Sequence, residues 1–311
     1  MFPDSYSRVK NTVPLSFCDI ISFGWRVKMH ADLKSVVATV GDLPPMPAVA
    51  VKVMELLQDP ESTAEGLANA ISADPAVSAR ILKIANSSFY GLQRQVSTLK
   101  AAIVILGQKT LRSLVLAASL TGMHRKYGLQ EKMLWEDSVG AAIAGRLLAQ
   151  HLRSLDPEEA FLAGLFRHIG KVVRSNNNNE EFTSIIQAVY NGEGTFSELE
   201  KHYFPHNHAV VGAAVLDKWN FAPALIQSTL HHEDLDIDPD GDLNAYRLTA
   251  AINLAGTMCR KLGIGQRSPE DDLDLSATAG AKALGMTQED LDDLVAQFRK
   301  VYAENRGLFV S

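Results

Sequence analysis

The sequence predicts an all-α fold, and three observations support this prediction. Apolar residues recur at helical spacing through most of the chain, as at Val49, Val53 and Leu57. Helix-start signals precede several of these patterns, in which a Ser, Thr or Asp is followed by a glutamate or a proline. No stretch of any length alternates apolar and polar residues as a half-buried strand does. We therefore expect a multi-helix fold built around apolar helix faces.

Residues 1–30 differ from the rest of the chain. The apolar stretch over residues 13–23 superficially suggests the core of a signal peptide, but Asp19 interrupts it and no small-x-small cleavage site follows. We interpret residues 1–30 as an N-terminal extension.

Residues 31–130 are expected to form a smaller N-terminal helical subdomain. The capping sequence at residues 62–65 starts one helix, and Asp74-Pro75 starts the next with an N-cap and a proline at the first helical position. The segment over residues 97–106 ends at Gly107, and a further helix with a buried apolar face follows it.

A larger helical subdomain is expected over residues 131–265. Asp156-Pro157 begins a buried helix in it that carries Arg167, His168 and Lys171 at its C-terminal end. Residues 266–311 are expected to be a C-terminal helical extension, because apolar residues recur there at helical spacing as far as Tyr302.

The composition limits the class of protein. With 311 residues, 46% hydrophobic and 21% charged, the chain is long enough for a large core and resembles a soluble globular protein. Its longest apolar runs fall short of the roughly 20 residues of a membrane-spanning helix. The net charge of −6 argues against nucleic acid as the main partner. Cys18 and Cys259 are isolated, so neither a disulfide nor a thiolate metal site is indicated, and we expect a cytoplasmic protein.

Gly107 leaves two interpretations open. The polar residues Lys109, Thr110, Arg112 and Ser113 follow it, which would suit the second helix of a DNA-binding helix-turn-helix. The helix becomes apolar after Ser113 and the protein is acidic, which favours an ordinary helical hairpin with a glycine C-cap.

The histidines are the main candidates for chemistry. His168 ends one predicted helix, His208 begins another, and His231-His232 ends a third. Imidazoles at helix ends can converge on one cation, and neutral nitrogen ligands suit zinc, iron or nickel. The alternative is that each is a hydrogen-bonded core histidine.

The sequence resembles the HDOD family, whose members are HD-related output domains of bacterial signalling proteins. The residues that carry this resemblance are spread over about residues 40–265, at Leu43-Pro44-Pro45-Met46-Pro47, Asp74-Pro75-Ala76-Val77, Ile81-Leu82-Lys83-Ile84-Ala85-Asn86-Ser87, Ala102-Ile103-Val104-Ile105-Leu106-Gly107, Leu134-Trp135, Ala163-Gly164-Leu165, His208-Ala209-Val210-Val211-Gly212-Ala213 and His231-His232. The resemblance implies an all-α HDOD fold in which a smaller N-terminal helical part packs on a C-terminal HD-like bundle. It also implies a role in signal output.

The HD phosphohydrolase superfamily, to which this family is related, presents metal ligands in the order His, His-Asp, His, His-His and Asp. Carried over residue by residue, that order places these residues at the site: Asp137, Arg167, His168, His208, His231, His232 and Asn253. Both residues of the His-Asp pair are changed, because Arg167 and His168 stand there. A two-metal hydrolase needs anionic bridging oxygens, whereas Arg167 cannot bind a metal and Asn253 carries no charge.

We therefore expect a bacterial regulatory protein with an altered, non-catalytic HD site that works by binding a protein or a small signalling molecule. The alternative functions are a mononuclear metal phosphohydrolase and a nucleic-acid-linked regulator. Two alternatives stay open for the histidines. Either His168, His208 and His231, with His232 adjacent, hold one metal ion, zinc, iron or nickel, or these histidines are structural and no metal is bound. Asp137, Arg167 and Asn253 would line the remainder of the site, and Asp137 would pair with Arg167.

Overall fold

The computed structural model describes residue 36 and residues 39–92, 95–123 and 128–309. These residues form α-helices and short 3₁₀ helices and contain no strand, which confirms the all-α prediction. Residues 1–30, interpreted above as an extension, lie outside the described residues.

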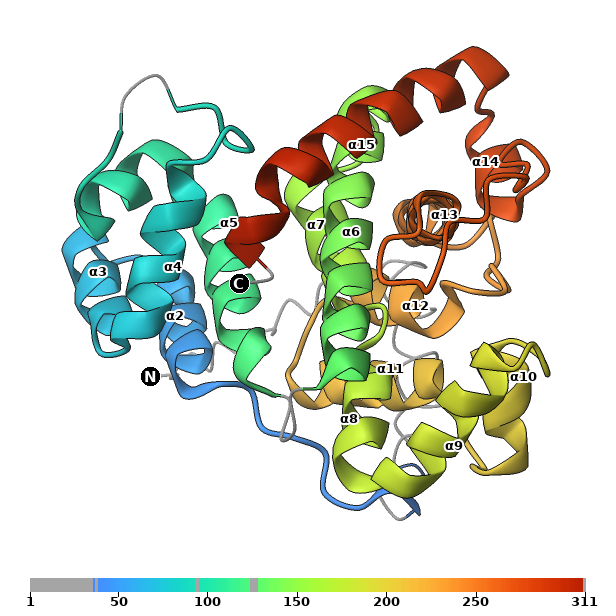
Figure 1. Ribbon diagram of the computed structural model, residues 1–311. Coiled ribbons are helices and arrows are strands. Elements are labelled where there is room, and N and C mark those ends of the chain that lie inside the picture. Colours follow the sequence, from blue (N-terminus) through green and yellow to red (C-terminus); the bar gives the residue numbers. More distant parts are fainter. Residues whose placement is uncertain (1–35, 37–38, 93–94, 124–127, 310–311) are drawn as a thin grey trace, which may run out of the picture.

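The N-terminal helices form a small bundle at one side of the molecule (Figure 1). Two predicted helix starts are confirmed there, although the N-cap of the first is Thr63 and not the first residue of the capping box expected over residues 62–65. Thr63 accepts a hydrogen bond from Gly66 N at 3.1 Å, and Asp74 accepts two, from Ala76 N and Val77 N. The helices are α2 (Ala48–Gln58), α3 (Ala64–Ser72), α4 (Pro75–Ala85) and α5 (Leu99–Leu120), and η1 (Thr121–Met123) follows.

Helix α5 bends sharply at Gly107. Gly107 has φ 79° and ψ 172°, which are not helical values and which residues with a side chain rarely adopt. The two segments expected on either side of Gly107 therefore meet at a kink. The six residues from Ser113 to Ala118 are all buried, which agrees with the helical hairpin rather than an exposed recognition helix. Leu99–Met123 is long and apolar enough to cross a membrane, but half of its most apolar window is buried inside the protein, which makes it weak evidence for a span.

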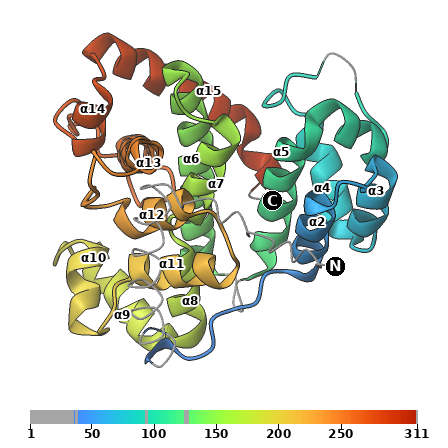
Figure 2. The same ribbon diagram turned by 180° about the vertical axis from the view of Figure 1, so that it is seen from behind.

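The remaining helices build the larger, C-terminal part. They are α6 (Leu129–Leu152), α7 (Pro157–Phe166), α8 (Ile169–Asn177), α9 (Asn179–Tyr190), α10 (Phe196–Leu199), η2 (Glu200–His202), α11 (His208–Lys218), α12 (Pro223–His231), α13 (Leu243–Leu262), α14 (Ala279–Leu284) and α15 (Gln288–Phe309). Helices α6 and α7 approach closely because Gly164 has no side chain, since a Cβ there would overlap the backbone of Ala141. Figure 2 shows α11 lying against α8 and α12.

One helix prediction needs correction. The helix that starts at Asp156-Pro157 ends at Phe166, and α8 begins at Ile169. Arg167 and His168 therefore lie in the turn between two helices, and Lys171 lies in the first turn of α8.

Helix α15 joins the two parts of the molecule (Figure 1). Its last described residue, Phe309, is 1% exposed and contacts the rings of Phe89 and Phe161, with centroids 6.0 and 6.2 Å away. Trp135 Nε1 donates a hydrogen bond to the Phe309 carbonyl oxygen at 2.7 Å. Phe89 follows α4 and Trp135 belongs to α6, so the end of α15 packs on both bundles.

Candidate functional site

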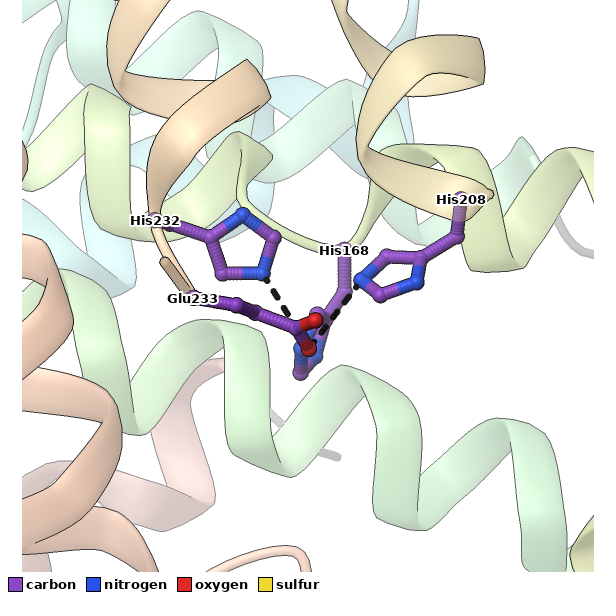
Figure 3. Close-up of side chains that lie close together, drawn as sticks. All are labelled: His168, His208, His232 and Glu233. Atoms are coloured by element: carbon purple, nitrogen blue, oxygen red, sulfur yellow. Dashed lines mark ion pairs between the residues drawn. The ribbon is translucent and has the colours of Figure 1, made fainter. Parts of the chain in front are cut away.

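Four side chains converge in the larger bundle, of which three are buried and Glu233 is exposed. His168, His208, His232 and Glu233 each offer one ligand atom, and these atoms all lie within 4.8 Å of one another (Figure 3). His168 comes from the turn between α7 and α8, His208 is the first residue of α11, and His232 and Glu233 follow α12. Three separate chain segments therefore supply the histidine cluster, as we call these four residues.

Local packing fixes the helix ends that carry the cluster. A Cβ on Gly170 would overlap the carbonyl of His208, so the missing side chain lets the start of α8 lie directly on the start of α11. Asn207 caps α11, and its side chain accepts a hydrogen bond from Val210 N at 2.9 Å. The rings of His168 and His208 are thereby held with their centroids 5.6 Å apart.

Hydrogen bonds on the outer side of two rings determine which nitrogen faces the cluster. Glu200 is fully buried, and its carboxylate accepts from the backbone N of His208 at 2.8 Å and lies 2.7 Å from His208 Nδ1. His232 Nδ1 lies 2.8 Å from the carbonyl oxygen of Thr229. Both acceptors require a proton on Nδ1, so in the neutral form of each ring the lone pair is on Nε2.

These lone pairs face a carboxylate. Glu233 Oε1 lies 3.5 Å from His208 Nε2 and 3.8 Å from His232 Nε2, and neither buried nitrogen has a hydrogen-bond partner among the residues that the structure describes. Two nitrogen lone pairs and a carboxylate repel one another unless a cation or a proton lies between them. The residues present therefore fit a bound cation.

His168 has a different environment. Its Nδ1 lies 2.9 Å from Asp137 Oδ2 but forms no well-aligned hydrogen bond, and its Nε2 lies 3.1 Å from Lys171 Nζ. The Lys171 ammonium also lies 4.6 Å from the centre of the Phe196 ring. His168 Nε2 can therefore bind a metal only if the contact with Lys171 Nζ is broken.

The ionisation of the cluster favours metal binding at neutral pH. Burial lowers the pKa of His232 to about 3, and burial together with the charge of Arg167 lowers the pKa of His168 well below its ordinary value. Burial raises the pKa of Glu233, but His208 and Lys171 opposite it outweigh burial and hold the pKa below its usual range. The result is neutral imidazoles at His168 and His232 beside an ionised carboxylate, which is the form that binds metals.

The other half of the site is closed by an ion pair. Arg167 Nη2 donates to Asp137 Oδ2 at 2.7 Å, and both side chains are buried, which confirms the predicted pairing. Gly256 makes room for the guanidinium, because a Cβ there would overlap it.

Asn253 holds the backbone in place. Its amide donates to the carbonyl oxygens of His232 and Glu233, and its oxygen accepts from Gly280 N at 3.0 Å. Its hydrogen bonds are thus made with the main chain, and not with the cluster side chains.

The structure corrects the expected ligand set at one position. It brings His168 and His208 together as expected, but His232 lies beside them in place of His231. His231 Nδ1 lies 3.2 Å from Asp234 Oδ1, and its side chain is 21% exposed. Neighbouring residues of a helix point about 100° apart, so only one of the two histidines can face the cluster.

Two residues of the site were not expected from the sequence. Glu233 follows His231-His232 directly, and a carboxylate next to two candidate ligands is the signal that could have identified it. Glu200 lies in η2, eight residues before His208, where no spacing rule links it to a metal ligand.

A cavity opens beside the cluster. Its volume is about 490 Å³, and it reaches from Asp137 and Arg167 past His232 and Glu233 to the surface. The rest of its lining is mainly polar and includes Lys171, Ser197, Thr257, Arg260 and Gln266. A small molecule could therefore reach the cluster through this opening.

The HDOD domain family model matches residues 43–235, which is more than half of the chain. The chain belongs to the HDOD family. Its fold is similar to that of an HDOD domain protein of unknown function from Geobacter sulfurreducens, with a TM-score of 0.71 and 23% identity over 92% of this chain and 98% of the other. It is also similar to a protein from Shewanella amazonensis that carries the provisional name of phosphohydrolase, with a TM-score of 0.69 and 26% identity over 91% of this chain and 98% of the other.

A curated relative is an uncharacterized protein from Treponema pallidum, 21% identical over 217 residues. The match covers 66% of this chain but only 40% of that relative. The HDOD chain therefore spans less than half of the length of this relative.

Proposed function

We propose that this HDOD protein is a non-catalytic regulatory protein of the bacterial cytoplasm that acts by binding a protein or a small signalling molecule. The observation that carries the proposal is the buried ion pair of Arg167 with Asp137. It puts a fixed positive charge where a two-metal hydrolase needs an anionic oxygen to hold its cations close together.

The same protein would hold one transition-metal ion. His208 and His232 would bind it through Nε2, His168 would supply a third nitrogen, and Glu233 a carboxylate oxygen. Neutral nitrogens with one carboxylate suit zinc, iron or nickel better than magnesium. When bound, the ion would supply a positive charge that neutralises Glu233 and attracts an anionic group from the adjacent cavity.

Hydrolysis assays test the absence of catalysis. Purified, untagged protein would be loaded in turn with zinc, iron and nickel, and incubated with cyclic dinucleotides, nucleoside phosphates and bis(p-nitrophenyl) phosphate. We expect no turnover above the metal-free protein. Turnover that requires the metal and is lost in His208→Ala would overturn the proposal.

The second candidate function is a mononuclear metal phosphohydrolase. Two features favour it, namely the open cavity beside the cluster and the likeness to the Shewanella protein with the provisional name of phosphohydrolase. The same assays separate the two functions, because a hydrolase must turn over a phosphoester in its metal-loaded form. Elemental analysis of the same samples shows whether the site was loaded.

A further inference from the structure

A second cavity lies at the seam between the two helical parts, and it shares no lining residue with the cavity at the histidine cluster. Its volume is about 500 Å³. Met46, Val51 and Met54 line it from the N-terminal part, and Trp219, Phe221 and Leu225 line it from the C-terminal part. Pockets for small molecules have volumes of about 300–1,000 Å³ and mostly apolar walls.

The aromatic wall of the seam cavity is held by specific contacts. Trp219 Nε1 donates to the Pro44 carbonyl oxygen at 3.0 Å, and Lys218 Nζ donates to the Leu43 carbonyl oxygen at 2.6 Å. The rings of Trp219 and Phe221 both pack on Phe166, with centroids 6.3 and 5.0 Å away. The wall is therefore formed before any ligand arrives, which lowers the entropy cost of binding.

One charged group at the seam cavity has no partner in the described part of the chain. Arg112 forms none of the ion pairs there, and its Nε is buried without a hydrogen-bond acceptor. Of the carboxylates on the lining, Glu55 pairs with Lys52 at 3.4 Å, whereas Glu159 accepts from the neutral amide of Asn244 at 3.3 Å and keeps its negative charge. A guanidinium that lines the cavity and forms no ion pair can bind the carboxylate of a ligand that enters it.

We propose that the seam cavity is a binding site for a small organic monocarboxylate with an apolar body. The carboxylate would accept the paired N–H groups of Arg112, for which guanidinium and carboxylate have matching shapes. The apolar body would lie against Trp219 and Phe221, and Met46 and Met54 would adapt to its shape. Such a ligand touches α2, α5 and the turn between α11 and α12, so it binds both parts of the molecule. The site is independent of the histidine cluster.

A matched acid and amide test the site. The probes are 4-phenylbutyrate and 4-phenylbutanamide, which differ in the charged group that Arg112 would bind. Binding would be measured by calorimetry and by tryptophan fluorescence, with Trp219→Phe identifying the local signal. We expect saturable binding of the acid and at least tenfold weaker binding of the amide. Equal affinities, or no saturable binding of the acid up to about 10 mM, at the weak end of specific binding, would overturn the proposal.

Variants locate the binding. Arg112→Gln should weaken the acid about tenfold, whereas Lys109→Gln, which removes an exposed charge from the same helix, should leave it unchanged. Val51 is 38% exposed, so Val51→Glu should fold normally and should weaken the acid more than the amide. Equal effects of Arg112→Gln and Lys109→Gln would contradict the assignment, and so would an unchanged acid affinity in Val51→Glu.

A last pair of measurements separates this site from the histidine cluster and from peptide recognition. Chelation of metal and His208→Ala should leave the affinity for 4-phenylbutyrate unchanged, and loss of binding in either would move the acid to the cluster and refute the seam site. A short peptide ending in a phenylalanine carboxylate should not bind more tightly than the free acid. Tighter peptide binding that Arg112→Gln abolishes would replace the small-molecule assignment with a peptide one.

Discussion

The two halves of the central site balance charge in different ways. On one side, His208, His232 and Glu233 bring two lone pairs and a carboxylate together across 3.5 and 3.8 Å. On the other side, Asp137 already has its cation, because the Arg167 guanidinium lies 2.7 Å away. The first half could take up a cation or a proton from outside, whereas the second carries a cation in its own sequence. Loss of one metal position therefore need not remove the other.

The comparison extends to the residues behind each half. Glu200 and the Thr229 carbonyl fix the tautomers of two rings from behind the histidine half. Behind the other half, Gly256 makes space for the guanidinium and Asn253 fastens the backbone. One half is organised to bind and the other to hold the fold, so mutations should separate metal affinity from stability.

The largest effect is expected at the ion pair. Asp137→Ala leaves the buried Arg167 guanidinium without its carboxylate, and we expect a loss of about 3–5 kcal/mol in the free energy of unfolding. Chemical denaturation of the metal-free protein measures it. The double variant Asp137→Leu/Arg167→Met removes both charges and should recover most of the loss. An unchanged stability in Asp137→Ala would show that the pair does not replace a cation.

Much of the fold was predictable because the signals are local. The Asp74 cap and the break at Gly107 depend on a few neighbouring residues, and the structure confirms both. The Asp137–Arg167 pair was predictable for another reason, namely that the resemblance to HD phosphohydrolases assigned both residues to one site.

The details of the site were less predictable because they depend on contacts between distant segments. His231 and His232 stand at the end of α12, where sequence gives no indication of which ring faces inward. The structure decides it through the Thr229 carbonyl, which holds His232. Glu200, in η2, hydrogen-bonds to His208 at the start of α11. The seam cavity forms only when α2 and α12 come together. No periodic pattern in the chain reports such contacts.

The next effect tests the support behind the histidine half. Glu200→Gln keeps the shape of the side chain but weakens its hold on His208 Nδ1, and we expect metal affinity to fall about 10–100-fold, as for other residues behind metal-bound histidines. Competition with a chromophoric chelator measures this affinity. Glu193→Gln, at an exposed position nearby, is the control and should have no effect. Similar losses in both variants would mean that general charge, and not the hydrogen bond to His208, sets the affinity.

The dependence of stability on pH should come from the histidine half of the site. The folded pKa of His232 is about 3, below the ordinary value of 6.5, so the unfolded chain takes up a proton first as the pH falls. The stability that this residue contributes is complete above its unfolded pKa and decreases below it, by about 2 kcal/mol between about pH 7 and about pH 5. Denaturation of metal-free protein across this range measures the slope.

Two variants assign the slope to its residue. His232→Gln should flatten the dependence by about that amount, whereas His202→Gln, at an exposed histidine, should leave the slope as in the wild type. Identical slopes in wild type and His232→Gln would place the titrating group elsewhere. Bound metal should raise the stability at pH 7 and make the acid loss steeper, because protons then compete with the ion for the same nitrogens.

The smallest effect is expected at Asn253, which belongs to α13. Its amide fastens the carbonyls of His232 and Glu233 to α13, and its oxygen fastens Gly280 at the start of α14. Asn253→Ala should therefore cost about 1 kcal/mol of stability for the lost hydrogen bonds and should leave the metal stoichiometry unchanged. Asn253→Asp should not recruit a second ion, because a carboxylate cannot donate to the two carbonyls and Arg167 still occupies the neighbouring space. Thermal denaturation and elemental analysis measure both quantities, with Asn244→Ala as an exposed amide control.

Two outcomes would contradict this role of Asn253. Loss of the metal in Asn253→Ala at unchanged stability would place Asn253 in the histidine half. A second equivalent of metal in Asn253→Asp would show that Arg167 does not close its side of the site.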